Sequence, residues 1–157
     1  MKLSYAFATS IGAMTIVANS SAVTQLLFQG EAPPADAVAG ESAVLNEAAA
    51  QLREYLTGDR RFFTVPLAPA GTDFMLKVWA SLTAIPYGET RSYQAIAQSI
   101  GRPKACRAVG LANHRNPLPL FIPCHRVVGA NGKLTGYRGG LPAKQYLLEL
   151  EQRHAQF

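Results

Sequence analysis

The segment that most limits how this chain can fold is an apolar run leading into Pro-Cys-His-Arg, at residues 120–126. Pro123 fixes its own φ angle and pushes Ile122 toward extended geometry, so the backbone approaching Cys124 has few conformations. Two further apolar residues and a turn-like Gly-Ala-Asn-Gly sequence follow, ending at residue 132. The pattern predicts a thiol held at the end of a buried segment, with a titratable imidazole beside it.

Cys124 is a candidate nucleophile if its proton can be removed. A thiol attacks only as the thiolate, and an ordinary cysteine pKa of about 8.5 leaves little thiolate at neutral pH. His125 and Arg126 are candidates for the base or the positive charge that would correct this. Because successive side chains of an extended backbone point to opposite faces, a water molecule or a local turn would have to connect His125 with Cys124. The alternative is an inert buried cysteine next to a histidine that only satisfies its hydrogen bonds.

Charge is placed unevenly along the chain. A length of 157 residues allows one domain or two small ones. Residues 1–85 carry 5 Lys and Arg against 7 Asp and Glu, a net charge of −2, whereas residues 86–157 carry 10 against 3, a net charge of +7. This asymmetry favours a support domain at 1–68 and a basic domain at 69–157 that faces a polyanion such as nucleic acid. A basic surface with no such partner is the alternative.

The first 22 residues allow two interpretations. A lysine near the start followed by small and apolar residues is typical of a secretory signal. Polar residues interrupt the apolar stretch, however, and Met14–Ala18 and Val23–Phe28 favour two strands joined by a polar turn. A loop over 31–40, a helix over Glu41–Leu56 and a strand over Phe62–Val65 complete an N-terminal half to which we assign structure and no chemistry.

Three helices are expected at the start of the basic half. The first is capped by Thr72 or Asp73 and ends before Ile85. The second is capped by Thr90 or Ser92 and spans Tyr93 to Ile100, and the third runs from Pro103 to about Asn113. Two short helices joined by Gly-Arg-Pro predict a helix-turn-helix. Two amphipathic helices packed in an ordinary core are the alternative.

The third helix carries small residues at the positions expected to be exposed. These are Ala105, Ala108, Gly110 and Ala112, with Lys104 and Arg107 among them. Small residues let a helix backbone lie close to DNA in a shallow minor groove, with little readout of base sequence. Close packing of the helix against another helix through the same alanines is an equally good interpretation.

Several separated blocks match one known family in order and spacing. They are Asn116-Pro117-Leu118-Pro119, Pro123-Cys124-His125-Arg126-Val127-Val128 and Gly136-Tyr137-Arg138-Gly139-Gly140. With them, the chain from about Gly71 to Glu151 resembles the O6-alkylguanine-DNA alkyltransferases, also called methylated-DNA–protein-cysteine methyltransferases. The resemblance implies an α+β fold, with a small N-terminal α/β module of the ribonuclease H-like kind and a C-terminal helix-turn-helix or winged-helix-like alkyltransferase domain.

The resemblance also implies a role for each matching position. Cys124 would be the alkyl acceptor, with His125 as its base through a water molecule and Glu151, on a final helix from about Pro142, orienting the histidine. Asn116 would be a hinge between the third helix and the cysteine segment. The residues expected to bind the substrate base are Tyr93, Val128, Tyr137 and Arg138. The residues expected to contact DNA are Arg107, Ala105, Ala108, Lys104 and Arg126.

The implied activity is direct reversal of DNA damage. The alkyl group of O6-alkylguanine, and of O4-alkylthymine, would pass irreversibly to Cys124 in a single turnover. Because the guanine O6 lies at the major-groove edge of the stack, a protein bound in the minor groove must rotate the base out into a pocket, at a cost of a few kcal/mol. Arg107 is the candidate to fill the gap that the base leaves.

No metal or cofactor is expected. The chain has no Cys or His before residue 106, and Cys106 and Cys124 form neither a CxxC pair nor a metal-ligand cluster. Cys106 is expected to be a small buried side chain. Two other functions stay open, a sensor of alkylated guanine that recruits repair without transfer, and a cysteine hydrolase that uses Cys124 and His125.

The expected partner is double-stranded DNA that contains alkylated guanine, bound by a monomer. No stretch approaches the ~20 apolar residues that span a bilayer, so no membrane partner is expected. With two cysteines that show no sign of pairing, a reducing compartment is the simplest expectation, and we expect a cytoplasmic, nucleoid-associated protein.

Overall fold

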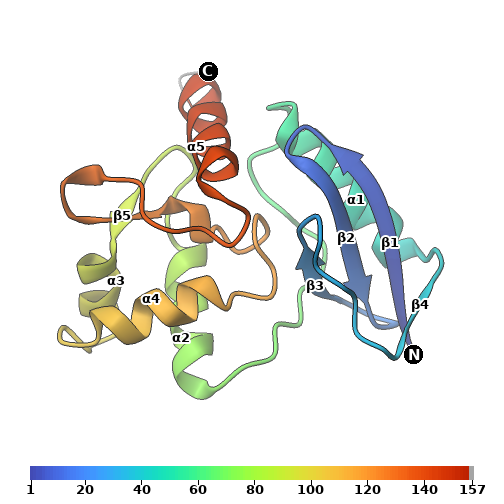
Figure 1. Ribbon diagram of the computed structural model, residues 1–157, viewed down its shortest axis with the longest axis horizontal. Coiled ribbons are helices and arrows are strands. Elements are labelled where there is room, and N and C mark those ends of the chain that lie inside the picture. The colour runs from blue at the N-terminus through green and yellow to red at the C-terminus, as the bar shows by residue number, and fades with distance from the viewer. Residues whose placement is uncertain (156–157) are drawn as a thin grey trace. The chain divides into compact units, whose positions relative to one another are not determined.

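The computed structural model of the chain describes residues 1–155. The chain divides into two compact units, residues 1–70 and the part that begins at Gly71. This division lies two residues from the boundary expected from composition and charge. The mixed α+β architecture expected from the sequence is confirmed, with strands gathered in the first unit and helices in the second (Figure 1).

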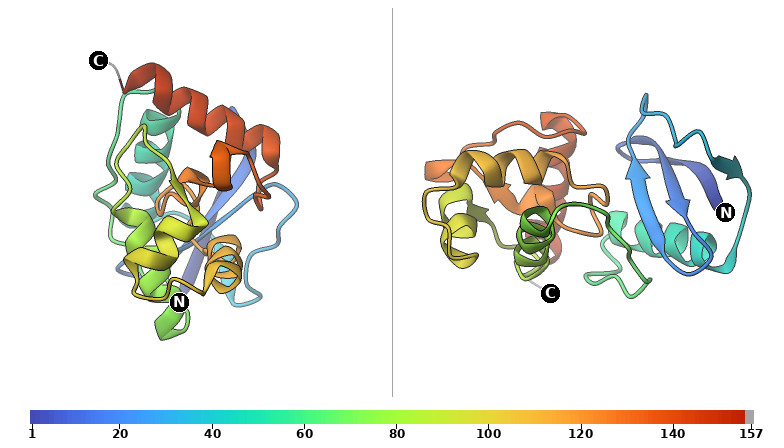
Figure 2. Two further views of the ribbon diagram at one scale, coloured as in Figure 1. Left: turned by 90° about the vertical axis from the view of Figure 1, so that its left-hand side faces the viewer. Right: turned by 90° about the horizontal axis from the view of Figure 1, so that it is seen from below.

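The first unit is a four-stranded sheet covered on one face by a helix. Its strands are β1 (Lys2–Thr9), β2 (Gly12–Ala18), β3 (Val23–Leu27) and β4 (Ala37–Ala39), in the order β3-β2-β1-β4. The β1–β2 and β2–β3 pairs are antiparallel and the β1–β4 pair is parallel. Helix α1 (Ala43–Leu56) lies along the sheet (Figures 1 and 2).

The expected hairpin is confirmed as β2–β3, where Thr15 pairs with Leu27 and Val17 with Gln25. The sequence analysis missed β1 and β4. Leu3, Tyr5 and Phe7 alternate with small or polar residues, which is the strand period, but the small residues between them hide it. β4 has three residues, too few for a period to show.

The expected strand at Phe62–Val65 is wrong. These residues follow α1 without joining the sheet, and a side chain takes up their backbone hydrogen bonds instead. The Gln51 Oε1 atom, buried on α1, accepts from the backbone N–H of Thr64 at 2.9 Å and of Val65 at 3.3 Å. The Gln51 amide donates in turn to the Thr64 hydroxyl at 2.7 Å. The Gln51 side chain therefore accepts the backbone hydrogen bonds that a neighbouring strand would otherwise accept.

The second unit is built mainly from helices, with a long segment between α4 and α5 that carries the cysteine turn. α2 (Asp73–Thr83), α3 (Tyr93–Ser99) and α4 (Cys106–His114) pack on one another, and α5 (Leu141–His154) closes the chain (Figures 1 and 2). The Trp79 indole N–H of α2 donates to the carbonyl of Ala112 on α4 at 2.9 Å. The caps are as expected, because the Thr72 and Ser92 hydroxyls accept from backbone N–H groups of α2 and α3.

Helix α4 begins at Cys106 and not at Pro103, which corrects the expected start. The residues from Pro103 to Ala105 form a turn, in which the N–H of Ala105 donates to the carbonyl of Arg102 at 3.0 Å. The second unit also has two short strands, β5 (Arg91–Ser92) and β6 (Val127–Val128). They pair in parallel, with Ser92 opposite Val128. This pairing brings the start of α3 beside the cysteine segment.

Replacing Gln51 with Met, which has a similar shape, should lower the free energy of unfolding by about 1–3 kcal/mol, because the buried N–H of Val65 and the part-buried N–H of Thr64 lose their acceptor. Gln98→Met, at an exposed position of α3, is the matched control and should change stability by less than about 0.5 kcal/mol. Chemical denaturation measures both. Equal effects of the two substitutions would contradict the role given to Gln51.

Candidate active site

A single turn of 3-10 helix, η1 (Cys124–Arg126), presents the cysteine and histidine. The N–H of Cys124 donates to the carbonyl of Ile122 at 2.7 Å, and the N–H of Arg126 donates to the carbonyl of Pro123 at 3.0 Å. The backbone at Cys124–Arg126 is thus a local turn and not an extended strand.

Asn116 holds the segment that leads to this turn. Its amide donates to the carbonyl of Ile122 at 2.8 Å, and its Oδ1 atom accepts from the N–H of Leu118 at 2.9 Å. Between these two points Leu120 is buried and has a φ angle of 69°, a left-handed conformation that a branched residue adopts only when its surroundings impose it. The fully buried asparagine therefore closes a tight loop in front of Cys124.

A second asparagine, which the sequence analysis missed, reaches the nucleophile from α4. The Asn113 amide donates to the carbonyl of Cys124 at 3.4 Å, and Asn113 is buried. The available signal was its position four residues after buried Val109, on the inner face of the helix. A polar residue on such a face needs a partner inside the protein.

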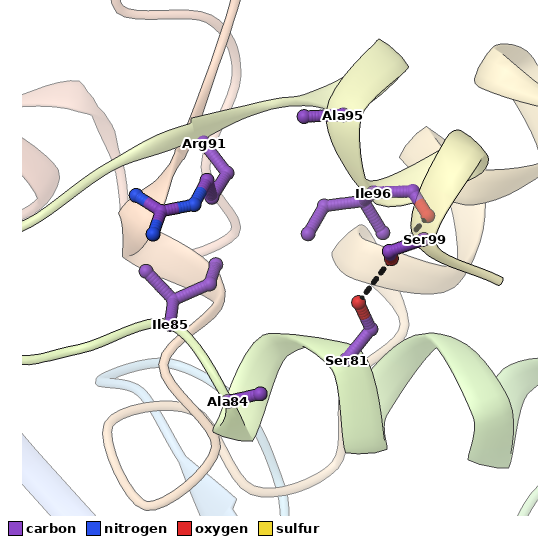
Figure 3. A pocket seen from close by; sticks show the side chains of 7 residues that line it. All are labelled: Ser81, Ala84, Ile85, Arg91, Ala95, Ile96 and Ser99. Carbon is purple, nitrogen blue, oxygen red and sulfur yellow. Dashed lines mark hydrogen bonds between the residues drawn. The ribbon is translucent and has the colours of Figure 1, made fainter.

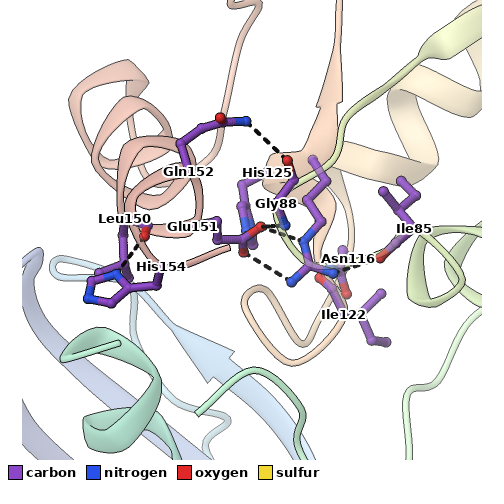
Figure 4. A network of polar contacts seen from close by, with 10 residues as sticks. Ile85, Gly88, Asn116, Ile122, His125, Leu150, Glu151, Gln152 and His154 are labelled. Atoms are coloured by element: carbon purple, nitrogen blue, oxygen red, sulfur yellow. Dashed lines mark hydrogen bonds and ion pairs between the residues drawn. The ribbon is translucent and has the colours of Figure 1, made fainter. Parts of the chain in front are cut away.

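The Glu151 carboxylate lies at the centre of the polar network that Figure 4 shows. Its Oε2 atom is 2.7 Å from His125 Nε2 and accepts from Arg126 Nη2 at 3.0 Å. Its Oε1 atom accepts from Arg126 Nε at 2.9 Å and from the backbone N–H of Gly88 at 3.0 Å. The expected pairing of Glu151 with His125 is thus present, and two further partners join it.

Gly88 is a contributor to the site that the sequence analysis treated only as the end of a helix. Its φ angle is +83°, and a Cβ atom there would lie 2.6 Å from the Cβ of Ala155. Only glycine lets the backbone N–H approach Glu151 in this conformation. The Gln152 amide also binds the carbonyl of Gly88, at 3.0 Å (Figure 4).

The contacts around Glu151 determine the protonation states of Glu151 and His125. Burial raises the pKa of Glu151, but the hydrogen bonds and charges of His125 and Arg126 together outweigh it and lower the pKa to about 2. Burial lowers the pKa of His125, against the opposing influence of Glu151. Because the ionised carboxylate can only accept, the neutral imidazole donates from Nε2 and carries its lone pair on Nδ1. His125 is therefore held as a base.

The thiol of Cys124 is enclosed, with 5% of the residue exposed. Burial raises its pKa, and the side chain of Asn116, the charges of Arg138 and Lys144 and the Tyr137 hydroxyl act in the opposite direction. The resting group is a neutral thiol, so its proton has to leave as the sulfur attacks. The cations that favour the thiolate come from the loop and helix that follow Cys124.

The expectation that Arg126 contacts DNA is wrong in this structure. Its side chain is 8% exposed, and its guanidinium pairs with Glu151 and donates from Nη1 to the carbonyl of Ile85 at 2.7 Å. A cation two residues after the candidate nucleophile suggests a phosphate contact, whereas the turn at Cys124–Arg126 directs it inward. Arg126 fixes the carboxylate that fixes His125.

The loop between β6 and α5 supplies the expected residues Tyr137 and Arg138. Burial raises the pKa of Tyr137 well above its ordinary value, and the nearby Cys124 thiolate acts in the same direction. Arg138 donates from Nη1 to the carbonyl of Asn116 at 2.6 Å. Lys144 of α5, which the sequence analysis did not select, is fully buried and donates to the carbonyl of Thr135 at 3.2 Å.

The other expected base-binding residues lie on neighbouring elements. Val128 is buried on β6 opposite Ser92, and Tyr93 follows directly as the first residue of α3. The Tyr93 hydroxyl lies 2.7 Å from the Thr135 hydroxyl.

Four of the five residues expected to contact DNA lie on α4 or in the turn that precedes it. Lys104, Arg107 and Ala108 are exposed and Ala105 is half-buried. The prediction for Ala112 is wrong, because it is 1% exposed and its carbonyl accepts from Trp79. Ala112 therefore packs inside the protein, whereas Ala108 lies on the exposed face of the same helix.

Two other features lie outside this cluster. Cys106 is half-buried rather than buried, and its thiol is 2.7 Å from Gln94 Oε1. A cavity of about 210 Å³ between α2 and α3 is bridged by the Ser81–Ser99 hydrogen bond (Figure 3) and contains none of the expected site residues. Within residues 1–155, no group of three His, Cys, Asp or Glu side chains is placed to hold a metal ion, and no helix has the length and apolar character to cross a membrane.

Both units match family models. Residues 3–69 match the ribonuclease-like domain of 6-O-methylguanine DNA methyltransferase, and residues 73–153 match its DNA binding domain. A methylated-DNA–protein-cysteine methyltransferase of Methanosarcina acetivorans is 60% identical over 105 residues, which is 67% of each chain. One of Mycobacterium bovis is 48% identical over 147 residues, covering 92% of this chain and 89% of the relative.

Solved structures agree with the sequence relatives. The crystal structure of Mycobacterium tuberculosis OGT in complex with DNA has a TM-score of 0.92 and 44% identity, covering 97% of this chain and 94% of that one. The O6-methylguanine-DNA methyltransferase of Pyrococcus kodakaraensis has a TM-score of 0.71 and 25% identity, covering 96% and 99%. From its buried Cys-His-Glu cluster and these matches, we conclude that the chain belongs to the methylated-DNA–protein-cysteine methyltransferase family.

Proposed function

We propose that this protein repairs O6-alkylguanine in double-stranded DNA by moving the alkyl group to the sulfur of Cys124. The observation that carries the proposal is a buried row of three groups. The neutral thiol of Cys124 and the neutral imidazole of His125 lie on one turn, and His125 Nε2 is hydrogen-bonded to the ionised Glu151 carboxylate at 2.7 Å. The relative solved in complex with DNA supports duplex DNA as the partner.

The transfer follows from these charges. His125 Nδ1 takes the thiol proton through a bridging water, and Glu151 stabilises the imidazolium that results. The sulfur attacks the O6-alkyl carbon in line, so that the S–C bond forms as the C–O6 bond breaks. The electron pair of the C–O6 bond goes to the guanine, which regains neutrality by taking up a proton. The product is a thioether on Cys124, and the chain is consumed after one turnover.

Access to the enclosed sulfur requires the base to leave the helix. We infer that α4 docks in the minor groove, where exposed Ala108 and half-buried Ala105 allow close approach. Arg107, exposed on the same helix, then fills the gap left by the rotated base. Lys104 lies beside this face, and Tyr93 is suited to meet the base edge and moderate the charge that develops on the leaving guanine.

We further propose a monomer that acts on the nucleoid in the cytoplasm. The charge of residues 86–157, +7 from 10 Lys and Arg against 3 Asp and Glu, favours binding to a polyanion. The contacts of the candidate site all arise within the second unit of one chain.

Cys124→Ala should abolish transfer of a labelled methyl group from duplex DNA while DNA binding persists. Cys106→Ala, which removes the other thiol, should transfer as the wild type does. Intact mass after incubation should show one added methyl group per wild-type molecule. Product exceeding protein by several-fold would indicate a hydrolase, and binding of methylated DNA without any mass change would indicate a sensor.

Glu151→Gln should slow transfer and lower the free energy of unfolding at pH 7 by about 3–5 kcal/mol, since buried Arg126 loses its counter-charge. Because the folded pKa of Glu151 is lowered to about 2 from 4.5, its stabilising effect is complete above about pH 4.5 and is lost as the pH falls toward 2. The variant should lose most of this acid dependence in denaturation series. Glu149→Gln, exposed on the same helix, is the control and should keep it.

Arg107→Ala should slow transfer from duplex DNA by at least about tenfold and leave transfer from the free modified base nearly unchanged, because the free base needs no flipping. Arg153→Ala, which removes an exposed charge from α5, controls for general loss of electrostatic attraction. Equal losses on both substrates for Arg107→Ala would remove Arg107 from the flipping step.

A further inference from the structure

Tyr93 is joined to the loop that follows the nucleophile by one short hydrogen bond. Its phenolic oxygen lies 2.7 Å from the hydroxyl of Thr135, 42 residues away in sequence. The bond connects the first turn of α3 with the segment between η2 (Ala130–Gly132) and α5. Thr135 is in none of the motifs that marked the site in the sequence.

Thr135 is held from two other directions. Its methyl group packs against Gly129, where a Cβ atom would lie only 2.9 Å from it. Its carbonyl accepts from the ammonium group of Lys144 at 3.2 Å, and Lys144 is fully buried. Lys144 also lies close enough to Cys124 for its charge to favour the thiolate and lower the pKa of the thiol. Contacts on its methyl group and on its carbonyl therefore fix the threonine that carries the hydroxyl.

The tyrosine ring is fixed by a different element. Gly110 of α4 faces the ring, and a Cβ atom at that position would be 3.8 Å from two of the ring carbons. Packing against α4 sets where the ring lies, but it cannot set where the phenolic proton points. A phenol has one proton and accepts through its oxygen as well, so its partner decides that direction.

We propose that Thr135 is a positioning residue that aims the Tyr93 hydroxyl at the flipped base. The inference rests on the proposed function, in which Tyr93 meets that base. When the Thr135 hydroxyl donates to the phenolic oxygen, the phenolic proton points away from Thr135 and is available to a ring nitrogen of the guanine. A hydrogen bond accepted by the phenol also strengthens the one that it donates.

The effect belongs to the transfer step rather than to binding. As the C–O6 bond breaks, its electron pair passes to the guanine ring, and a donor already aimed at that ring stabilises the charge without reorganising. A phenol that points toward Thr135 would first have to rotate. The affinity for DNA depends on α4 and its cations, which Thr135 does not touch in the described contacts.

The test is a double-mutant cycle between Thr135→Val and Tyr93→Phe, with Thr135→Ser as the conservative variant. Single-turnover rates at saturating methylated duplex report the transfer step, and Kd values on unmodified duplex report binding. Thr135→Val should slow transfer about 3- to 10-fold with an unchanged Kd, the amount expected for one lost hydrogen bond. Thr135→Ser should stay within about twofold of the wild type, because it keeps the hydroxyl.

Adding Thr135→Val to Tyr93→Phe should cause no further loss, because the two side chains act through one bond. A full additional loss in that background, or a change confined to Kd, would overturn the inference. Tyr93→Phe that transfers at the wild-type rate would instead remove Tyr93 from the proposed function. Should Thr135→Val not fold, as judged by thermal melting, the same cycle is run with Thr135→Ala.

Discussion

The carboxylate of Glu151 is the group on which the rest of the site depends. It is 1% exposed, and a buried carboxylate is tolerated only when donors surround it. Its donors come from two places in the sequence, Gly88 after α2 and both His125 and Arg126 on the cysteine turn, while Glu151 itself is on α5. Forming this cluster therefore fixes the two ends of the second unit against the nucleophile.

In the same arrangement, the charged groups are different residues from the neutral base. Arg126 neutralises the carboxylate, so His125 can remain uncharged and keep its capacity to accept a proton. The thiol is handled by another set of groups, with Asn116 beside it and the cations Arg138 and Lys144 acting at longer range. Two polar systems thus meet at adjacent residues, Cys124 and His125.

The basic character of the second unit is only partly a surface property. Of its eleven Lys and Arg residues, Arg126 and Lys144 are buried. Arg126 is paired with Glu151, and Lys144 binds a loop carbonyl. The cations that remain outside, including Lys104 and Arg107, are those able to attract a polyanion. The net charge of the sequence thus indicated a polyanionic partner, but it overstated the positive charge at the surface that can attract one.

The sequence by itself determined the capped helices and the β2–β3 hairpin and indicated the candidate nucleophile and its histidine, because each depends on local chemistry or a short hydrophobic period. It also pointed to Glu151 and Asn116 through matched motifs. Tertiary structure alone decided that Arg126 turns inward, that Gln51 replaces a strand at Thr64, and that Asn113 and Thr135 reach the site. Those outcomes depend on contacts between residues 11 to 42 positions apart, which no local period encodes.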